Sequence, residues 1–372
     1  MTTLPQRRKN VSLRDVASLA GVGITTVSDI VNRQVEGKYP EHTRERVLQA
    51  VRQTGYTPSR AAQKLGGKRS KEVGVVLTRT FENPFFARLT HEIQKQLGRR
   101  GYRAQLHVTG KDLFLLSRFP VELLGDHVDG VVLGPVYESD REHLEALHAF
   151  EDAGIPVTLF GGSCGTAHAE FLWPHDAAGR LAADMLLDRG HRRILFLGSG
   201  VGSAKRRDGK VSGIEAAVEA RGGMLDRVPH ADTGDYEDFY QTAASFCRSW
   251  RSTPEAQRAT AVICLNDQLA VSLYAACSDL NIAIPSDLSV VSFDNIPESV
   301  VLRPALSTID FRAADQVQRI VDLMVCRIEG RDPNGSATPA EPIALVRDSV
   351  RPLRDDTPAP TGAPVSPHDR GS

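Results

Sequence analysis

The chain has 372 residues, of which 41% are hydrophobic and 24% are charged, and its formal net charge is −1. This length is enough for two or three domains with a substantial core, and the composition is that of an ordinary globular protein. Charge is unevenly distributed, because residues 1–70 hold 13 Lys and Arg against 5 Asp and Glu, a net of +8, whereas the remainder carries −9. A basic segment joined to an acidic remainder is typical of a nucleic-acid-binding module attached to another domain.

No run of apolar residues is long enough to span a bilayer, and the basic start Arg7–Lys9 lacks the apolar core of a signal peptide. We therefore expect a cytoplasmic protein without a membrane partner. The cysteines form an odd set without CxxC spacing, which indicates reduced thiols and predicts neither a disulfide framework nor a metal site. They are Cys164, Cys247, Cys264, Cys277 and Cys326. No cofactor is predicted.

Residues 11–32 predict two short helices around a turn at Gly21–Gly23. Ser12 and Asp15 have the spacing of a capping box, and Val16, Leu19 and Ala20 follow on one helical face. In the second helix Val27, Ile30 and Val31 form the inner face. The opposite face is expected to carry Ile24, Thr25, Ser28, Asp29 and Asn32.

This pattern has two interpretations, a helix-turn-helix that places its second helix in the DNA major groove, or an αα-hairpin that only packs. A third helix, beginning at Pro40–Glu41 and ending at Gly55, and the basic charge favour DNA binding. Arg33, Lys38, Arg44 and Arg60 are candidates for contacts to the DNA backbone, although each can equally be a solvated charge. The candidate DNA-binding residues of residues 1–60 are Ser12, Ile24, Thr25, Thr26, Ser28, Asp29, Asn32, Arg33 and Arg60.

Residues 57–70 have the composition of a linker. Pro58 ends the preceding element, Ser59 can cap a short helix, and Gly66–Gly67 stops it. So short a helix is marginal in water and needs a partner to persist. At the other end of the chain, residues 355–372 are rich in Pro, Gly, Ser and Thr, and we expect them to be disordered.

From Val73 onward, short apolar strands alternate with helical segments, which predicts parallel sheets built from βαβ units. Ligands of such sheets bind at the carboxyl ends of the strands. The expected strands are Val73–Leu77, Gly130–Leu133, Pro156–Phe160, Ile194–Gly198, Ala261–Leu265 and Ser289–Phe293. The predicted fold class is therefore α/β, with an all-α helix-turn-helix head in front of it.

Several segments occur together in one order: SLRDVASLAGVGITTVSDIVN, GYTPSRAAQKLGGKRS, ENPFF, VDGVVLGP, DRGHRRILFLG, LND, IPSDLSVVSFDN and RPALSTI. In this respect the chain resembles the lac repressor family of bacterial transcription regulators, over about residues 11–351. The resemblance implies a two-lobed body, like that of periplasmic sugar-binding proteins, with a small-molecule effector between the lobes. It also implies a homodimer, or a tetramer, on operator DNA.

By this resemblance we expect a head at 1–57, a hinge at 58–70 and a body at 71–354. One lobe is expected at about 71–173 and 308–332, and the other at about 174–307 and 333–352. Leu65 matches the hinge leucine that the family inserts into the minor groove, where a wedge between base steps kinks the duplex. The alternative is a flexible linker with Leu65 packed on the body.

The resemblance also places effector-binding residues. Trp173 and Tyr236 match aromatic positions that stack on the ligand, Phe81 is a weaker match, and Lys210 stands where the family usually has arginine. Asn266 and Asp294 each follow a predicted strand and match hydrogen-bonding positions. Alternatively, Asp267 and Asp294 cap the following helix or turn, and this interpretation is preferred for Asp267. Gly161 and Gly134 offer no side chain where relatives often do, which weakens a hexose assignment.

Several members of the resembling family carry arginine at the position of Asp29. The role of the aspartate is therefore open. It can accept from cytosine N4, cap, or pair with a neighbouring arginine. We expect a DNA-binding transcription repressor controlled by a small polar metabolite, possibly a sugar or sugar derivative. The alternative is a solute-binding sensor that binds DNA only non-specifically. Gly161–Gly165 matches GxSxG but no helix is expected after Ser163, so the chain is predicted not to be an enzyme.

Overall fold

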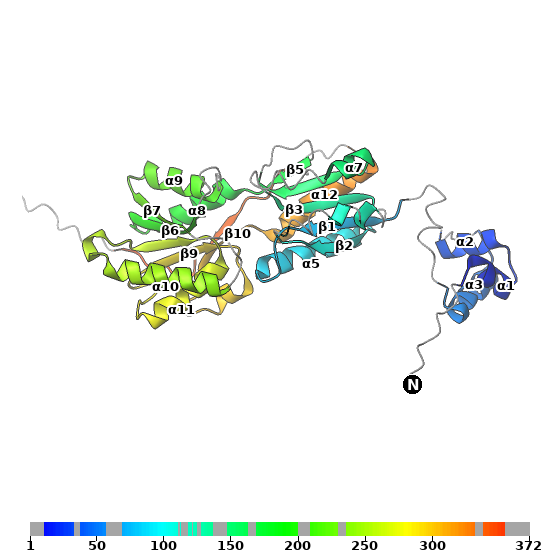
Figure 1. The fold of residues 1–372 in the computed structure, drawn as a ribbon, viewed down its shortest axis with the longest axis horizontal. Helices are drawn as coiled ribbons and strands as arrows, with labels where there is room; N and C mark the ends of the chain where they lie inside the picture. The colour runs from blue at the N-terminus through cyan, green and yellow to red at the C-terminus, as the bar shows by residue number, and fades with distance from the viewer. Residues whose placement is uncertain are drawn as a thin grey trace, which may run out of the picture. The chain divides into compact units, whose positions relative to one another are not determined.

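The computed structural model describes residues 11–32, 38–56, 69–110, 112, 118–120, 122–124, 128–136, 147–162, 169–199, 209–229, 236–331 and 338–353. The chain divides into two compact units, Met1–Glu72 and Val73–Ser372 (Figure 1). Within these described residues, no helix is both long and apolar enough to cross a membrane.

The N-terminal unit is a group of three helices, α1 (Leu13–Ala20), α2 (Ile24–Asn32) and α3 (Glu41–Thr54). The predicted boundaries are confirmed, because Gly21 and Gly55 have positive φ angles and end α1 and α3. Asp15 accepts hydrogen bonds from the backbone N–H and the hydroxyl of Ser12, as the capping box predicted.

The three helices share one apolar core. Its buried members include Val16 of α1, Val27 of α2 and Val47 of α3, each with no exposed surface. Leu19 was predicted to face this core and does not, because it is 53% exposed and Ala17 is buried in its place. The inner face of α1 is therefore rotated by part of a turn from the predicted one.

The second unit contains two sheets, which confirms the α/β fold class. The first sheet has the strand order β2-β1-β3-β4-β5, and the pairs that join β1, β3, β4 and β5 are parallel. Its strands are β1 (Glu72–Leu77), β2 (Arg103–Val108), β3 (Gly130–Val136), β4 (Val157–Gly161) and β5 (Ala169–Leu172). The helices around it include α5 (Pro84–Arg99), α7 (His148–Asp152) and α12 (Ala313–Glu329).

The second sheet has the order β11-β10-β9-β8-β6-β7 and is parallel except for the antiparallel edge pair β10 and β11. Figure 1 shows α8 and α9 on one face and α10 and α11 on the other. The strands are β6 (Arg193–Ser199), β7 (Met224–Pro229), β8 (Ala261–Cys264), β9 (Ser289–Phe293), β10 (Ser307–Asp310) and β11 (Ile343–Leu345). The helices are α8 (His175–Leu187), α9 (Gly209–Ala220), α10 (Tyr236–Ser252) and α11 (Asp267–Asp279).

The chain passes between the two sheets three times. It leaves β5 for α8 at Trp173–Pro174, leaves β10 for α12 at Phe311–Arg312, and returns from α12 to β11. The predicted change of lobe at residue 308 falls inside β10, which pairs with β9 and so belongs wholly to the second sheet. The first two crossings meet, because the ring centroids of Trp173 and Phe311 lie 5.5 Å apart.

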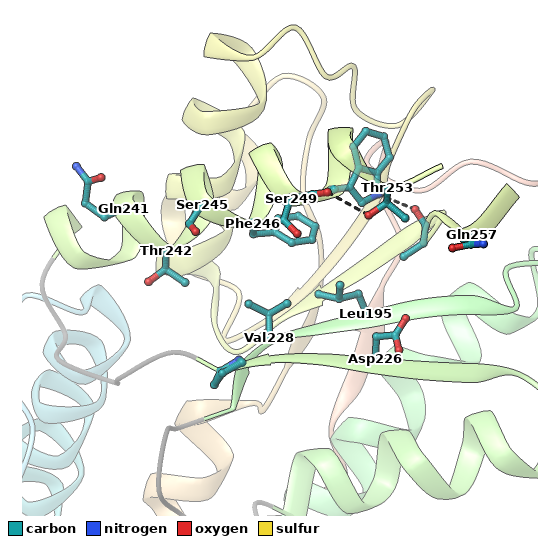
Figure 2. A pocket seen from close by; sticks show the side chains of 13 residues that line it. Leu195, Asp226, Val228, Gln241, Thr242, Ser245, Phe246, Ser249, Thr253 and Gln257 are labelled. Carbon is teal, nitrogen blue, oxygen red and sulfur yellow. Dashed lines mark hydrogen bonds between the residues drawn. The ribbon is translucent and has the colours of Figure 1, made fainter. Parts of the chain in front are cut away.

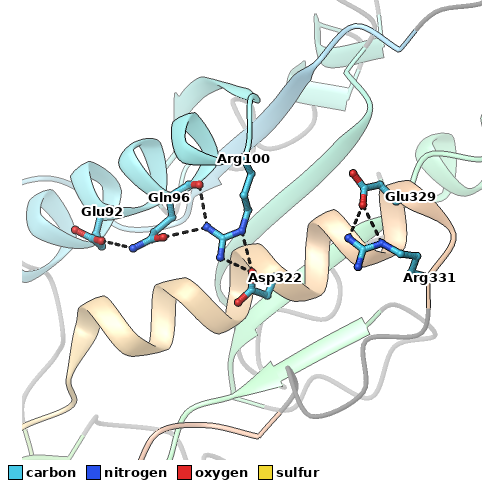
Figure 3. Close-up of polar contacts among 6 residues, drawn as sticks. All are labelled: Glu92, Gln96, Arg100, Asp322, Glu329 and Arg331. Carbon is cyan, nitrogen blue, oxygen red and sulfur yellow. Dashed lines mark hydrogen bonds and ion pairs between the residues drawn. The ribbon is translucent and has the colours of Figure 1, made fainter.

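Polar contacts hold α12 to α5 after the chain has returned to the first sheet (Figure 3). Arg100, the residue after α5, donates from Nε to Asp322 of α12 at 2.8 Å and from Nη1 to Gln96. Gln96 in turn donates to Glu92 at 2.7 Å. One arginine therefore connects segments more than 200 residues apart in the sequence.

Candidate DNA-binding face and effector site

The outer face of α2 is the candidate DNA-binding surface. Ile24 is 44% exposed and Thr25 is exposed as well, whereas Thr26 and Ser28 are half-buried. Val27 and Ile30 on the inner side are buried in the three-helix core. The helix thus presents methyl and hydroxyl groups outward, the groups that meet thymine methyls and base edges in a major groove.

Asp29 was predicted on this outer face, and that prediction is wrong. Its side chain is 1% exposed, and its Oδ2 accepts hydrogen bonds from Lys38 Nζ at 2.6 Å and from the Tyr39 hydroxyl at 2.9 Å. The hydrogen bond and charge of Asp29 raise the pKa of Lys38. Of the interpretations left open, pairing with a neighbouring arginine is the nearest to the finding, but the basic partner is Lys38 and not an arginine.

The other predicted DNA-binding residues divide into two groups. Ser12 is exposed at the start of α1, with its hydroxyl donated to Asp15, and Asn32 is the last residue of α2. Arg33, Arg60 and Leu65 lie outside the described residues, as does the hinge helix predicted between Ser59 and Gly66.

Trp173 and Lys210 both contact Phe311, near where the chain crosses between the sheets. Each is 8% exposed. Phe311 contacts both, because its ring lies 5.5 Å from that of Trp173 and its centroid lies 5.4 Å from Lys210 Nζ. Lys210 donates to the Leu265 carbonyl at 3.0 Å and lies over the Phe293 ring at 4.5 Å. A cation is thus held against aromatic faces, where the attraction is strongest away from water.

Asp294 follows β9 and is 8% exposed. Burial raises the pKa of this carboxyl group, and the charge of Lys210 and a hydrogen bond from Asn83 partly offset that rise. Asn83 directly precedes α5, one of the helices around the first sheet. It caps this helix by accepting a hydrogen bond from the Phe85 N–H. Asp294 has φ of 104° and is followed by Asn295 with φ of 50°, so the turn is strained.

Asn266 and Asp267 follow β8, and Asp267 does not have the capping role preferred for it from the sequence. Asn266 is the N-cap of α11, because its side chain accepts from the Leu269 N–H at 2.9 Å. Asp267 does not cap the helix. It is fully buried and accepts from the Ile296 N–H at 2.9 Å and the Thr308 hydroxyl at 2.7 Å. Burial, and then the charge of Asp294, raise its pKa to about 7.

Phe81 and Tyr236, the remaining candidates, are more open than the others. Phe81 is 44% exposed in the segment between β1 and α5, and Tyr236 is 41% exposed as the first residue of α10. Partial burial and the nearby Glu298 raise the pKa of Tyr236. Both side chains have ring surface available for a ligand, whereas Trp173 is enclosed by protein.

Sequence reasoning missed residues that complete this site. Phe85 and Phe311 pack edge-on against Trp173, and Arg88 of α5 donates to the Asn295 carbonyl at 2.6 Å, a direct link between the two sheets. A usable signal existed for Phe311, which directly follows β10 at the carboxyl edge of the sheet. Arg88 lies on an exposed helical face, and nothing in the local pattern distinguishes it from a solvated charge.

A groove of about 550 Å³ lies elsewhere, on the outer side of the second sheet between α10 and β7 (Figure 2). The residues that line it include the apolar Leu195, Phe246 and Trp250 and the hydroxyl-bearing Thr242 and Ser249. None of the six predicted effector-binding residues lines it. Among the described residues, no group of three or more His, Cys, Asp or Glu is placed to hold a metal ion.

Comparison with known proteins identifies both units. Residues 12–59 match the family described as bacterial regulatory proteins, lacI family, and residues 183–350 match a periplasmic binding protein-like domain. A transcriptional repressor PurR of Mannheimia succiniciproducens is 28% identical over 342 residues, covering 91% of this chain and 98% of that protein. The ribose operon repressor of Haemophilus influenzae is 28% identical over 351 residues, covering 92% and 99%.

Solved structures show the same fold. The lac repressor dimer bound to operator and the anti-inducer ONPF has a TM-score of 0.76 at 23% identity, covering 92% of this chain and all of that one. A complex of the regulator CelR with cellobiose has a TM-score of 0.62 at 23% identity, covering 91% and 99%. The chain thus carries a head that matches the lacI family of bacterial regulatory proteins and a body that matches a periplasmic binding protein-like domain, and its relatives with this arrangement are transcriptional repressors aligned over nearly their whole length.

Proposed function

We propose that this chain is a transcription repressor that binds operator DNA as a homodimer. The observation that carries the proposal is the two-sided character of α2, whose Val27 and Ile30 are buried while Ile24 and Thr25 are exposed. A two-fold dimer places two such helices on the half-sites of a palindrome, because one head covers too little groove by itself. The hinge at 58–70 adds a minor-groove wedge at Leu65. We place the protein in the cytoplasm and assign it no reaction.

The effector is a small polar metabolite bound between the two sheets of the body. Lys210 and Asp294 supply opposite charges there, and the exposed rings of Phe81 and Tyr236 supply apolar surface. Arg88 and Asn83 already join the two sheets across this region, so a ligand that favours one arrangement of the lobes changes their equilibrium. Coupling to the head is then reciprocal, since DNA and effector each alter the affinity for the other.

Selection of duplexes from a random pool tests whether the protein recognises a specific DNA sequence. Substitutions then distinguish contacts to the bases from contacts to the DNA backbone. Thr25→Ala should change the preferred base at one or two positions of each half-site, by about 1–3 kcal/mol per position. Arg44→Ala, at a candidate backbone contact, should weaken all duplexes equally and reduce the salt dependence. Leu65→Ala should weaken operator binding and leave effector binding intact. Equal affinity for selected and random duplexes at every ionic strength would contradict the proposal.

The same operator then allows a search for the effector. Release or tightening of the operator complex is measured against a library of metabolites at fixed salt, because affinity for DNA depends steeply on ionic strength. The competing function, a sensor with non-specific DNA binding, was suggested by a carboxylate on the reading face. Asp29 is buried instead, so that observation no longer favours it.

A further inference from the structure

The two tryptophans of this chain differ in how their indole N–H groups are satisfied. Both side chains are 8% exposed. Trp250 donates from Nε1 to the Ala259 carbonyl at 2.8 Å. The Nε1 of Trp173 is buried and makes no hydrogen bond within the described part of the chain. Buried polar groups nearly always have a partner, and an orphaned donor is a feature that requires a reason.

The surroundings of Trp173 fix its ring and leave little of its face free. Phe85 and Phe311 pack against it in edge-on geometry, each with 5.5 Å between ring centroids, and His175 is stacked at 6.4 Å. Phe160 is tilted against it at 6.5 Å. A ring enclosed in this way does not offer a stacking surface to a ligand. The part of Trp173 that is left without an interaction is the N–H group at the edge of its ring.

A second donor, Lys210, contacts the same Phe311 ring and also donates to the Leu265 carbonyl. The ammonium group of Lys210 is 5.4 Å from the centroid of Phe311, the ring that also contacts Trp173. We call these three residues the crossover corner, because Trp173 lies at the first crossing between the sheets and Phe311 at the second. The corner combines an indole N–H and a cation, and both favour an oxygen acceptor with negative charge.

We propose that the Trp173 indole N–H donates a hydrogen bond to the effector, and that the effector therefore carries a carboxylate or carbonyl oxygen which reaches the crossover corner. The proposal rests on the proposed function for the existence of an effector, and goes beyond it by naming the group recognised. It assigns Trp173 the role of a donor at a ring edge, in place of the stacking surface expected from the resemblance.

The indole N–H groups can be observed directly, because the full-length chain labelled with ¹⁵N-tryptophan has only two of them. Trp250→Phe assigns the signals. Sodium acetate and sodium gluconate are titrated as carboxylate probes, with methylammonium chloride, glucose and sodium chloride as matched probes lacking the carboxylate. We expect a saturable downfield shift of the Trp173 proton with the carboxylates, and no shift of the Trp250 proton. A static Trp173 signal, or an equal shift with sodium chloride, would overturn the proposal.

Trp173→Phe provides the second measurement, since it retains an aromatic ring and removes the N–H. Affinity for gluconate should fall about tenfold, the loss expected for one hydrogen bond, while Trp250→Phe keeps it. Unchanged gluconate affinity in Trp173→Phe would count against the proposal. A metabolite that alters operator binding without moving the Trp173 signal would refute this inference and leave the repressor function standing. If acetate or gluconate moves the signal while no metabolite affects operator binding, this inference would be supported and the proposed repressor function would be contradicted.

Discussion

The carboxylate of Asp29 accepts a hydrogen bond from the hydroxyl of Tyr39 at 2.9 Å, and this contact joins α2 to the segment leading into α3. The same oxygen accepts from Lys38 at 2.6 Å. Asp29 is 1% exposed, so these donors replace the hydrogen bonds that water would otherwise give. The residue that seemed most unusual for a DNA-reading helix is a structural part of the head.

Asp29→Asn should therefore destabilise the head by about 1–3 kcal/mol, because the amide oxygen can replace the carboxylate oxygen as acceptor but the negative charge that pairs with Lys38 is lost. Hydrogen exchange of the backbone amides in residues 13–54 of the full-length protein measures this. Glu45→Gln on the exposed side of α3 is the matched control and should leave exchange unchanged. A folded variant head should select the same operator as the wild type. An altered base preference would instead show that Asp29 takes part in reading the DNA bases.

His191 should make the body less stable as the pH falls from about 6.5 to 4. The side chain is fully buried, with Nε2 donating to the Arg351 carbonyl at 3.0 Å and Nδ1 accepting from the Thr260 hydroxyl at 2.8 Å. Burial lowers its pKa from 6.5 to about 4. Between these values the unfolded chain binds a proton that the folded chain does not, so stability is lost on acidification, by up to roughly 3 kcal/mol.

The measurement is the difference between the pH profiles of unfolding free energy for the wild type and His191→Gln. The glutamine variant should be less stable at pH 7.5 but show a flatter profile between pH 4 and 6.5. Parallel profiles for the two proteins would show that His191 titrates alike in both states.

Asp267 should act in the opposite direction. Its pKa is raised to about 7 by burial, so the folded chain retains a proton that the unfolded chain loses from about pH 4 upward, and stability falls as the pH rises through this window. Asp267→Asn removes the titration. The amide can accept from the Ile296 N–H and donate to the Thr308 oxygen after the hydroxyl rotates.

Asp267→Asn should thus gain stability over the wild type by about 1–4 kcal/mol at pH 8.5 and little at pH 4. Asp267→Ala, which loses both hydrogen bonds, should be less stable than the wild type at pH 4. Chemical denaturation at the two pH values distinguishes these outcomes. A gain for the asparagine variant that is the same at pH 4 and pH 8.5 would argue against a titrating carboxyl group.

Arg88→Ala should loosen the connection between the sheets. The guanidinium group donates from Nη1 to the Asn295 carbonyl at 2.6 Å and is otherwise exposed, so we expect a loss of about 1 kcal/mol, roughly fivefold in a local opening equilibrium. Faster amide exchange at Asn295 and Ile296 reports it. Arg99→Ala, on the same helix, is the control and should not change exchange there.

The sequence by itself determined the elements of this protein. Apolar residues at helical spacing located α2, runs of β-branched residues located six strands, and Gly21 and Gly55 marked helix ends because glycine readily adopts a positive φ. These signals are local, since each depends on residues within one or two turns or one strand. They sufficed for the fold class, and the order of the motifs indicated the family.

Only the tertiary structure decided how individual polar and aromatic side chains are used. Asp29 lies one helical turn after the exposed Thr25, yet it is buried and hydrogen-bonded to Tyr39, beyond the end of α2. Asp267 looked like a helix cap and instead bonds Thr308, 41 residues away. Trp173 is enclosed by Phe311, 138 residues further along the chain. Such partners are brought together by packing between elements, and packing depends on the whole chain, so no local pattern could predict them.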